Sequence, residues 1–232
     1  MRKAVRSRPD PGLLAAERPV PARGAWTLPL LAHGPTRAVG GDGDDDGGTV
    51  AWIAAGTAFQ VRAFVPSPAG RGYLMLEAAA GQATLASHEP DEAAVLDVLA
   101  RRHGRPAVEQ VLCGDGVQAM YRAVCELRGE RARRIGLASL IAHACAARDP
   151  NCSRALAMFC GLLGDVAGHV ALTLGAGGGV VIAGEIVDML GDWFPRSPFR
   201  RRFEARGRCR DTLRAIPTVV AGRAAQPRPA TG

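Results

Sequence analysis

The sequence predicts an α/β fold in which helices flank a mixed β-sheet. Three observations support this prediction. Short apolar segments at 49–55, 60–66 and 73–79 are separated by turn residues, which indicates a β-meander. Most of the chain from 90 to 206 has helical periodicity, interrupted by one β-branched run at 180–182. The last apolar run, IPTVVAG at 216–222, predicts a final strand.

The helices are indicated by their ends as well as by their apolar faces. Pro90 precedes two acidic residues and is followed by arginines near residue 102, an arrangement that complements the helix dipole over 90–103. The same kind of pattern predicts further helices at 116–128, 137–147, 185–192 and 198–206.

A long helix is predicted after Asp149, which is a suitable N-cap, and Pro150, which suits a first helical position. One face carries Cys152, Leu156, Phe159, Leu163, Val166 and Val170. The opposite side is also apolar, so we expect this helix to be buried over most of its surface. Its few polar residues include Asp165 and His169, which are four positions apart and are expected to form a structural pair.

The composition excludes several classes of protein. The chain has 232 residues and a net charge of +7, but Lys3 is its only lysine and it lacks interleaved aromatic and basic residues, so we expect no nucleic-acid partner. It has no uninterrupted apolar run of membrane-spanning length and no secretory pattern at its start, which predicts a cytoplasmic protein without a membrane partner. None of the six cysteines forms a C-x-x-C pair, which argues against a zinc site.

The ends of the chain differ from its middle. Residues 1–25 are rich in Arg and Pro and are expected to be a disordered tail, as are residues 223–232, which leaves one domain at 26–222. Asp42, Asp44 and Asp46 match the opening of an EF-hand loop, but Ile53 stands where the bidentate glutamate is needed. We therefore expect a solvated acidic loop at 40–48.

The stretch GAGGGVVIAGEIVDML at 175–190 combines a glycine cluster, a short strand, a second turn and the start of a helix. Such a unit is common in nucleotide-binding proteins, where backbone N–H groups approach phosphates closely. It is equally compatible with a plain connection between elements of the core. The spacing by itself leaves both interpretations open.

Several stretches together resemble one family. CGDGVQAMYRAV at 113–124, the long helix and strand at 152–184, and FRRRFEARGR at 199–208 are similar to the C-terminal domain of the bacterial ATP-dependent glucokinases. That family belongs to the hexokinase–actin–Hsp70 superfamily, and the resemblance covers about residues 27–220. It implies a ribonuclease-H-like, actin-like ATPase fold for the domain at 26–222.

The resemblance implies a site for ATP, with Mg²⁺ bridging its β- and γ-phosphates. Gly178, Gly179, Ala183 and Gly184 correspond to the strand and glycines that line the family's adenosine pocket. Glu185 replaces the usual second glycine after that strand, which is expected to crowd the pocket. Gly56 and Thr57 correspond to the family's second phosphate loop. Only half of the sequence of that loop is retained in this chain.

The resemblance also implies contacts to glucose. Glu109 matches the family's glutamate that accepts hydrogen bonds from sugar hydroxyls. The stretch 79–82 replaces the family's Glu-Gly-Gly-His loop, and within it Gln82 is still able to donate a hydrogen bond to the sugar. Because family members commonly dimerise, a homodimer is expected as well.

Two parts of the family's machinery are expected to be absent. Residue 27 aligns with the family's chain well past its first phosphate loop, Asp-x-Gly-Gly-Thr, and past its catalytic base, an Asp that follows an Asn. The family phosphorylates glucose to glucose 6-phosphate in glycolysis, and we expect this chain to be truncated and inactive alone. The alternatives are a non-catalytic remnant that binds nucleotide or a partner, and a truncated gene product with no function of its own.

Overall fold

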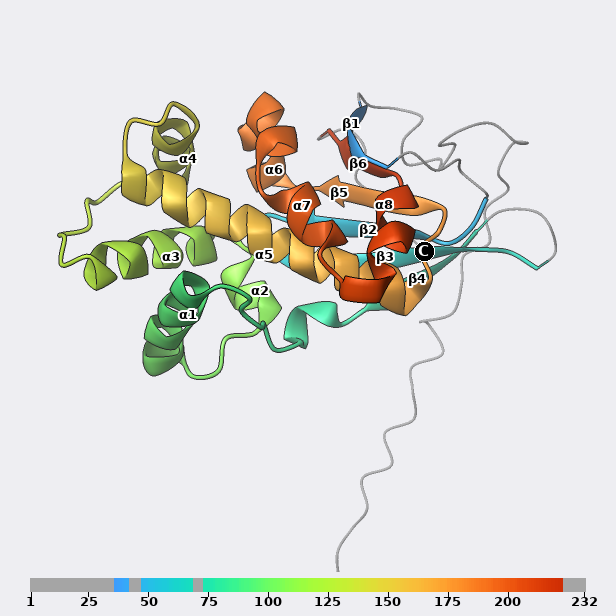
Figure 1. The fold of residues 1–232 in the computed structure, drawn as a ribbon, viewed down its shortest axis with the longest axis horizontal. Coiled ribbons are helices and arrows are strands. Elements are labelled where there is room, and N and C mark those ends of the chain that lie inside the picture. Colours follow the sequence, from blue (N-terminus) through green and yellow to red (C-terminus); the bar gives the residue numbers. More distant parts are fainter. Residues whose placement is uncertain (1–35, 42–46, 69–72, 223–232) are drawn as a thin grey trace, which may run out of the picture.

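The computed structural model describes residues 36–41, 47–68 and 73–222, and within them a six-stranded sheet is packed against helices (Figure 1). The strand order is β1-β6-β5-β2-β3-β4. The strands are β1 (Thr36–Gly40), β2 (Val50–Ala55), β3 (Phe59–Pro66), β4 (Tyr73–Ala78), β5 (Gly179–Ala183) and β6 (Thr218–Ala221).

The sheet is mixed, as predicted. The three central strands β6, β5 and β2 are parallel, whereas β1 pairs antiparallel with β6, and β3 and β4 continue antiparallel from β2. The predicted β-meander is therefore confirmed as β2-β3-β4, and the predicted strands at 180–182 and 216–222 are confirmed as β5 and β6. The edge strand β1 was not predicted.

The helices follow the predicted positions with some differences. They are α1 (Pro90–His103), α2 (Val108–Val111), α3 (Gly114–Leu127), α4 (Leu137–Cys145), α5 (Pro150–Leu174), α6 (Glu185–Leu190), α7 (Phe199–Glu204) and α8 (Arg210–Ala215). Short 3₁₀ turns occupy Ala80–Gln82, Gly191–Arg196 and Gly207–Cys209. The short helices α2 and α8 were not predicted.

Helix α5 is the central element of the core. The side chain of Asp149 accepts hydrogen bonds from the backbone N–H groups of Asn151 and Cys152, at 2.9 and 3.1 Å, which confirms the predicted cap. Among the described helices, α5 alone is long and apolar enough to cross a membrane, but 78% of its most apolar window is buried inside the fold. Its apolar composition is therefore explained by packing in the core.

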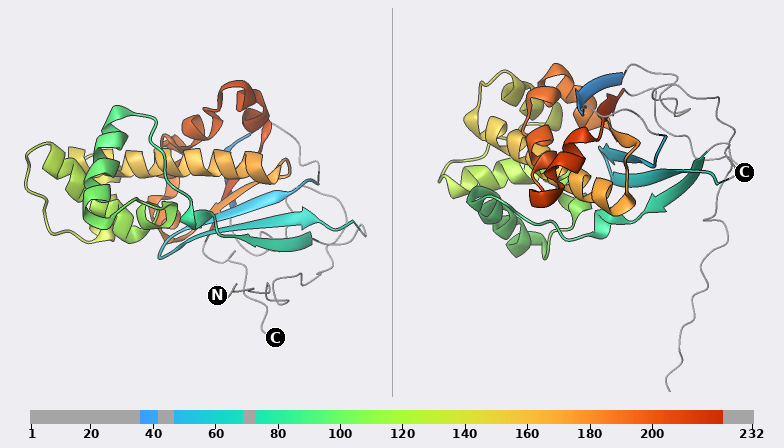
Figure 2. Two further views of the ribbon diagram at one scale, coloured as in Figure 1. Left: turned by 90° about the horizontal axis from the view of Figure 1, so that it is seen from below. Right: turned by 45° about the vertical axis from the view of Figure 1, so that its right-hand side comes forward.

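Two apolar clusters lie on opposite faces of the sheet. Successive residues of β2 alternate between them: Ala51 and Ile53 belong to the large core with the helices, whereas Val50 and Trp52 belong to a smaller cluster with residues of β3, β5 and β6. Figure 2 shows α5 running along one face of the sheet. Strand β2 is thus buried on both sides, as expected for a central strand.

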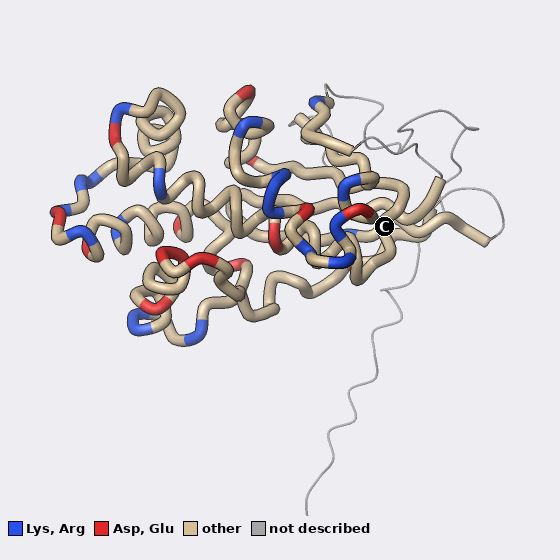
Figure 3. Tube along the Cα trace, in the orientation of Figure 1, with Lys and Arg blue, Asp and Glu red and all other residues tan. Residues whose placement is uncertain are grey.

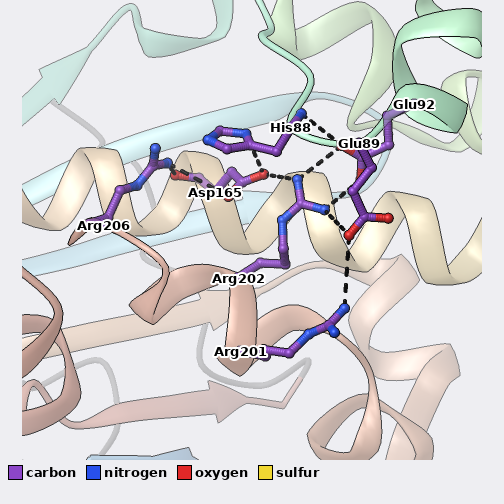
Figure 4. Close-up of polar contacts among 7 residues, drawn as sticks. All are labelled: His88, Glu89, Glu92, Asp165, Arg201, Arg202 and Arg206. Atoms are coloured by element: carbon purple, nitrogen blue, oxygen red, sulfur yellow. Dashed lines mark hydrogen bonds and ion pairs between the residues drawn. The ribbon is translucent and has the colours of Figure 1, made fainter.

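A buried ion cluster joins three helices that are distant in sequence (Figure 4). Arg202 of α7 donates to both carboxylate oxygens of Glu92 in α1, at 2.7 and 2.9 Å, and also donates to Asp165 of α5. The side chains of these residues are at most 7% exposed. Gly164 and Gly168 allow α7 to approach α5 so closely, because a Cβ at either position would lie within 2.5 Å of a carbonyl oxygen of α7.

The predicted pair of Asp165 and His169 is not the arrangement found. Asp165 faces α7 and the segment before α1, where it meets Arg202, His88 at 3.4 Å and Arg206 at 3.9 Å, whereas His169 is exposed. A helix whose polar residue faces a second helix gives the same sequence pattern as one with a local i, i+4 pair. The spacing alone therefore did not distinguish the two arrangements.

Some predictions fall on parts of the chain outside the described residues. These are the tails at 1–25 and 223–232 and the acidic residues Asp42, Asp44 and Asp46.

Candidate functional site

The candidate site lies where two neighbouring parallel strands end. Strands β2 and β5 pair in parallel, with Ala54 opposite Ala183, so Gly56 and Gly184 follow them at the same edge of the sheet (Figure 1). In open α/β sheets, ligands bind preferentially outside the carboxyl ends of parallel strands. The predicted residues Gly56, Thr57, Ala183 and Gly184 are therefore brought together.

The backbone at this edge leaves no room for a side chain at Gly184. Gly184 has a φ of +113°, and a Cβ there would lie 2.2 Å from the carbonyl oxygen of Ala55. On the other side, a Cβ at Gly56 would lie 3.4 Å from the backbone nitrogen of Glu185. The glycine that follows β5 is thus explained by close contact with the end of β2. Glu185 itself is exposed and lies beside the hairpin.

The β2–β3 hairpin also contacts the start of α3. The backbone N–H of Gly114, the first residue of α3, donates to the carbonyl of Gly56 at 3.1 Å. Between the strands, Thr57 and Ala58 are exposed, so the hydroxyl of Thr57 is open to a ligand. The start of α3 was missed by the sequence analysis, which began this helix at 116 and assigned the preceding glycines to a turn.

The two residues predicted to contact sugar hydrogen-bond to each other. Nε2 of Gln82 donates to Oε1 of Glu109 at 2.6 Å, which joins the 3₁₀ turn Ala80–Gln82 to α2. A Cβ at Gly81 would lie 3.1 Å from the other carboxylate oxygen of Glu109 and 3.5 Å from the carbonyl of Phe59. The Gln82–Glu109 pair is therefore adjacent to the β2–β3 hairpin that carries Gly56 and Thr57.

Gly178 and Gly179 lie elsewhere. They stand at the amino end of β5, where Gly178 donates to the carbonyl of Thr49 at 3.0 Å. A Cβ at Gly178 would lie 2.5 Å from the carbonyl oxygen of Gly48. Because β5 extends over five residues, about 13 Å of strand separates Gly179 from Ala183. These two glycines consequently join the amino ends of β2 and β5 rather than the edge with Gly56.

One expectation about the sequence itself needs correction. The letters at 45–49 do spell Asp-x-Gly-Gly-Thr, the pattern expected to be absent. In the structure, Gly47, Gly48 and Thr49 lead into the amino end of β2, where the carbonyl of Thr49 accepts a hydrogen bond from Gly178, while the two preceding acidic residues lie outside the described residues. The described part of this motif is thus at the opposite end of β2 from Gly56.

Comparisons of the sequence with family models and with curated proteins point to the same family. The family model for glucokinase matches residues 22–226. Glucokinase of Aromatoleum aromaticum is 44% identical over 196 residues, which cover 84% of this chain and 59% of the relative. Glucokinase of Nitrobacter hamburgensis is 37% identical over 196 residues, covering 84% of this chain and 61% of the relative. The chain thus spans about three fifths of the length of these curated relatives.

Solved structures agree with the sequence matches. A glucokinase from an Antarctic psychrotroph aligns with a TM-score of 0.73 at 25% identity, over 80% of this chain and 57% of that one. A glucokinase of Balamuthia mandrillaris, solved in complex with glucose, aligns with a TM-score of 0.72 at 14% identity, over 83% of this chain and 55% of that one. With a family model that matches most of its residues, the chain belongs to the glucokinase family.

Proposed function

We propose that this chain forms one half of an ATP-dependent glucose kinase cleft, holding nucleotide and one side of the sugar. The observation that carries the proposal is the meeting of three features at the carboxyl edge of the sheet. These are the Gly56–Thr57 hairpin, the tight turn at Gly184, and the Gln82–Glu109 pair beside them. Membership of the glucokinase family and the glucose bound in the Balamuthia structure support the same assignment.

On the nucleotide side, the exposed hairpin presents the backbone N–H of Thr57 and its hydroxyl to phosphate oxygens. Ala183 and Gly184 border the place proposed for the adenosine. Among residues 36–41, 47–68 and 73–222, no group of three or more His, Cys, Asp or Glu is arranged to hold a metal ion. We therefore propose that Mg²⁺ is held chiefly by the phosphates of the nucleotide, as is common for this ion.

On the sugar side, the carboxylate of Glu109 accepts hydrogen bonds from two glucose hydroxyls. Gln82 orients that carboxylate by donating to one of its oxygens, and Glu109 is only half buried, so the other face of the carboxylate stays open to a ligand. Hydrogen bonds to a charged group contribute about 1.5–3 kcal/mol each, which makes Glu109 the main sugar contact proposed here.

We further propose that the 232-residue chain does not transfer phosphate by itself. Sugar phosphorylation needs a carboxylate that takes the proton from the attacking hydroxyl. The sequence contains a single asparagine, Asn151, and it is followed by Cys152, so the Asn-Asp pattern of the family's base does not occur. Losing a general base costs about 10²–10⁴ in rate. Cytoplasmic location and a homodimer are proposed from the family alone.

The test consists of three measurements on the purified chain. ATP at millimolar concentration is expected to raise the melting temperature, because a ligand that binds only the folded state stabilises it. Thr57→Val should reduce that increase, whereas the matched control Thr212→Val, an exposed threonine in α8, should not. Flat melting curves with ATP would exclude the nucleotide site.

The second measurement is formation of glucose 6-phosphate from glucose and Mg-ATP in a coupled assay. No product above a blank is expected from the chain alone. Turnover that is lost in Glu109→Ala would contradict the proposed inactivity, while supporting the sugar contact. Titration with glucose should give a binding signal that Glu109→Ala abolishes and Glu126→Ala, a carboxylate of α3 outside the site, leaves unchanged.

A further inference from the structure

Four exposed arginines lie around the segment that joins α3 to α4, at the end of the molecule away from the sheet (Figure 1). Arg122 belongs to α3, and Arg131, Arg133 and Arg134 belong to the linker. Figure 3 shows basic positions along this linker and the neighbouring part of α3.

The carboxylates of the same segment are already paired with other arginines. Glu126 pairs with Arg102 of α1. Glu130 pairs with Arg128 at 2.9 Å and accepts a hydrogen bond from Asn151 at 2.8 Å. As a result, within the described part of the chain none of the four arginines has a carboxylate partner.

Three of these arginines line one hollow. Arg122, Arg133 and Arg134 surround a depression of about 530 Å³ together with Tyr121 and Gly136. The linker is fixed there by the buried Tyr121, whose hydroxyl accepts a hydrogen bond from the backbone N–H of Arg133 at 3.2 Å. Gly136 is the N-cap of α4, and the first turn of α4 has no acidic residue, so the helix dipole adds to the positive potential.

We propose that this hollow binds a small anion that carries two or more phosphate groups. Guanidinium groups form paired, charge-assisted hydrogen bonds with phosphate oxygens, and they lose less hydration on binding than ammonium groups do. Three lining arginines without carboxylate partners suit a polyanion better than a single phosphate. The size of the hollow falls in the usual range for small-molecule sites, about 300–1,000 Å³.

The hollow is separate from the candidate nucleotide site. Helix α3 contacts the Gly56 hairpin through Gly114 at its first residue and leads into the arginine linker at its other end. None of the residues proposed to hold ATP or glucose lines the hollow, although Leu137, which follows the lining residue Gly136, packs against Gly114 at the start of α3.

The experiment is calorimetric titration of the full chain with inorganic tripolyphosphate in the absence of Mg²⁺. Arg133→Gln combined with Arg134→Gln is expected to raise the dissociation constant at least about tenfold. The matched control combines Arg101→Gln with Arg105→Gln, two exposed arginines at and beyond the end of α1. It removes the same charge and should change the constant by less than about twofold.

A second variant, Arg122→Gln, removes the third lining arginine and should also weaken binding, and circular dichroism checks that each variant is folded. Equal weakening by the linker pair and the control pair would mean general charge attraction and would overturn the proposal. Absence of tripolyphosphate binding would overturn it too. Tight binding of a single-stranded oligonucleotide that depends on Arg133 and Arg134, without binding of tripolyphosphate, would replace it with a nucleic-acid site.

Discussion

Arg202 donates to both carboxylate oxygens of Glu92, although the two residues are 110 positions apart in the chain. The pair links α7 to α1 across α5 and is buried on all sides (Figure 4). Charges removed from water in this way are tolerated only while each keeps its partners. The stability of the helical side of the molecule therefore depends on a contact that no local sequence pattern encodes.

Replacing Arg202 should be strongly destabilising. Arg202→Met leaves Glu92 and Asp165 buried without their shared partner, which is expected to cost about 3–5 kcal/mol in the free energy of unfolding. Urea denaturation measures this change. The neighbouring Arg201→Met is the control. The side chain of Arg201 is 74% exposed and its ion pair with Glu89 is long, at 4.0 Å, so its loss should cost less than about 1 kcal/mol. Similar losses for the two variants would contradict the role given to the cluster.

The same cluster predicts that the stability of the fold depends on pH in the acid range. Burial tends to raise the pKa of Glu92, but hydrogen bonds from Arg202 and from the backbone of His88, with the charge of Arg202, bring the pKa below its ordinary value of 4.5. A carboxyl group with a lowered pKa in the folded state stabilises the fold above its unfolded pKa. That stability is lost as the pH falls below about 4.5 and through the lower folded value.

Urea midpoints measured between about pH 3 and pH 6 test this dependence. The wild-type chain should lose stability on the acid side more steeply than Glu92→Gln, which has no carboxyl group to protonate at this position. Parallel curves for the two proteins would show that Glu92 does not contribute to the acid sensitivity.

A methyl group at Gly184 should disturb the candidate site. In Gly184→Ala the new Cβ meets the carbonyl of Ala55, and the φ of +113° is unfavourable for alanine, so a cost of about 1–3 kcal/mol is expected. Gly136→Ala is the control with the opposite sign. No atom lies within 4 Å of its added Cβ and its φ is −75°, so a gain of about 0.4–1 kcal/mol is expected. Thermal unfolding distinguishes these outcomes.

The buried cysteines should resist thiol reagents in the folded state. Burial raises the pKa of both Cys152 and Cys160 to about 12, and neither residue is accessible to solvent. At pH 8 only about one thiol in 10⁴ is then ionised at each position. Mass spectrometry after brief treatment with iodoacetamide should find these two residues unmodified in the native chain and modified in urea. Early labelling of Cys160 in the native chain would contradict its place in the core.

Elements with strong local signals were predicted well from the sequence. Asp149 and Pro150 mark the start of α5, and its apolar residues on nearly every side predicted burial correctly. Strand β1 carried no such signal because it is short and partly exposed, and among the described strands it pairs with β6, which lies about 180 residues later in the sequence. Local propensity contains no information about such a distant partner.

The candidate site could be predicted in part. Resemblance pointed to Gln82 and Glu109 separately, but their direct contact depends on how the turn at 80–82 packs on α2. The separation of Gly179 from Gly184 was available from spacing alone, since five residues of strand place the two ends far apart. The structure places Gly178 and Gly179 at the opposite end of β5 from Ala183 and Gly184.

The pairing of Thr36 with Ala221 has a consequence for how the protein is made. During synthesis, β1 emerges from the ribosome long before β6, so this edge of the sheet closes only after β6 has been made. Until then β1 lacks the strand that it pairs with in the folded sheet, a situation that favours association with other nascent chains. Chaperone dependence during expression should therefore be relieved by a circular permutation that makes the two strands consecutive.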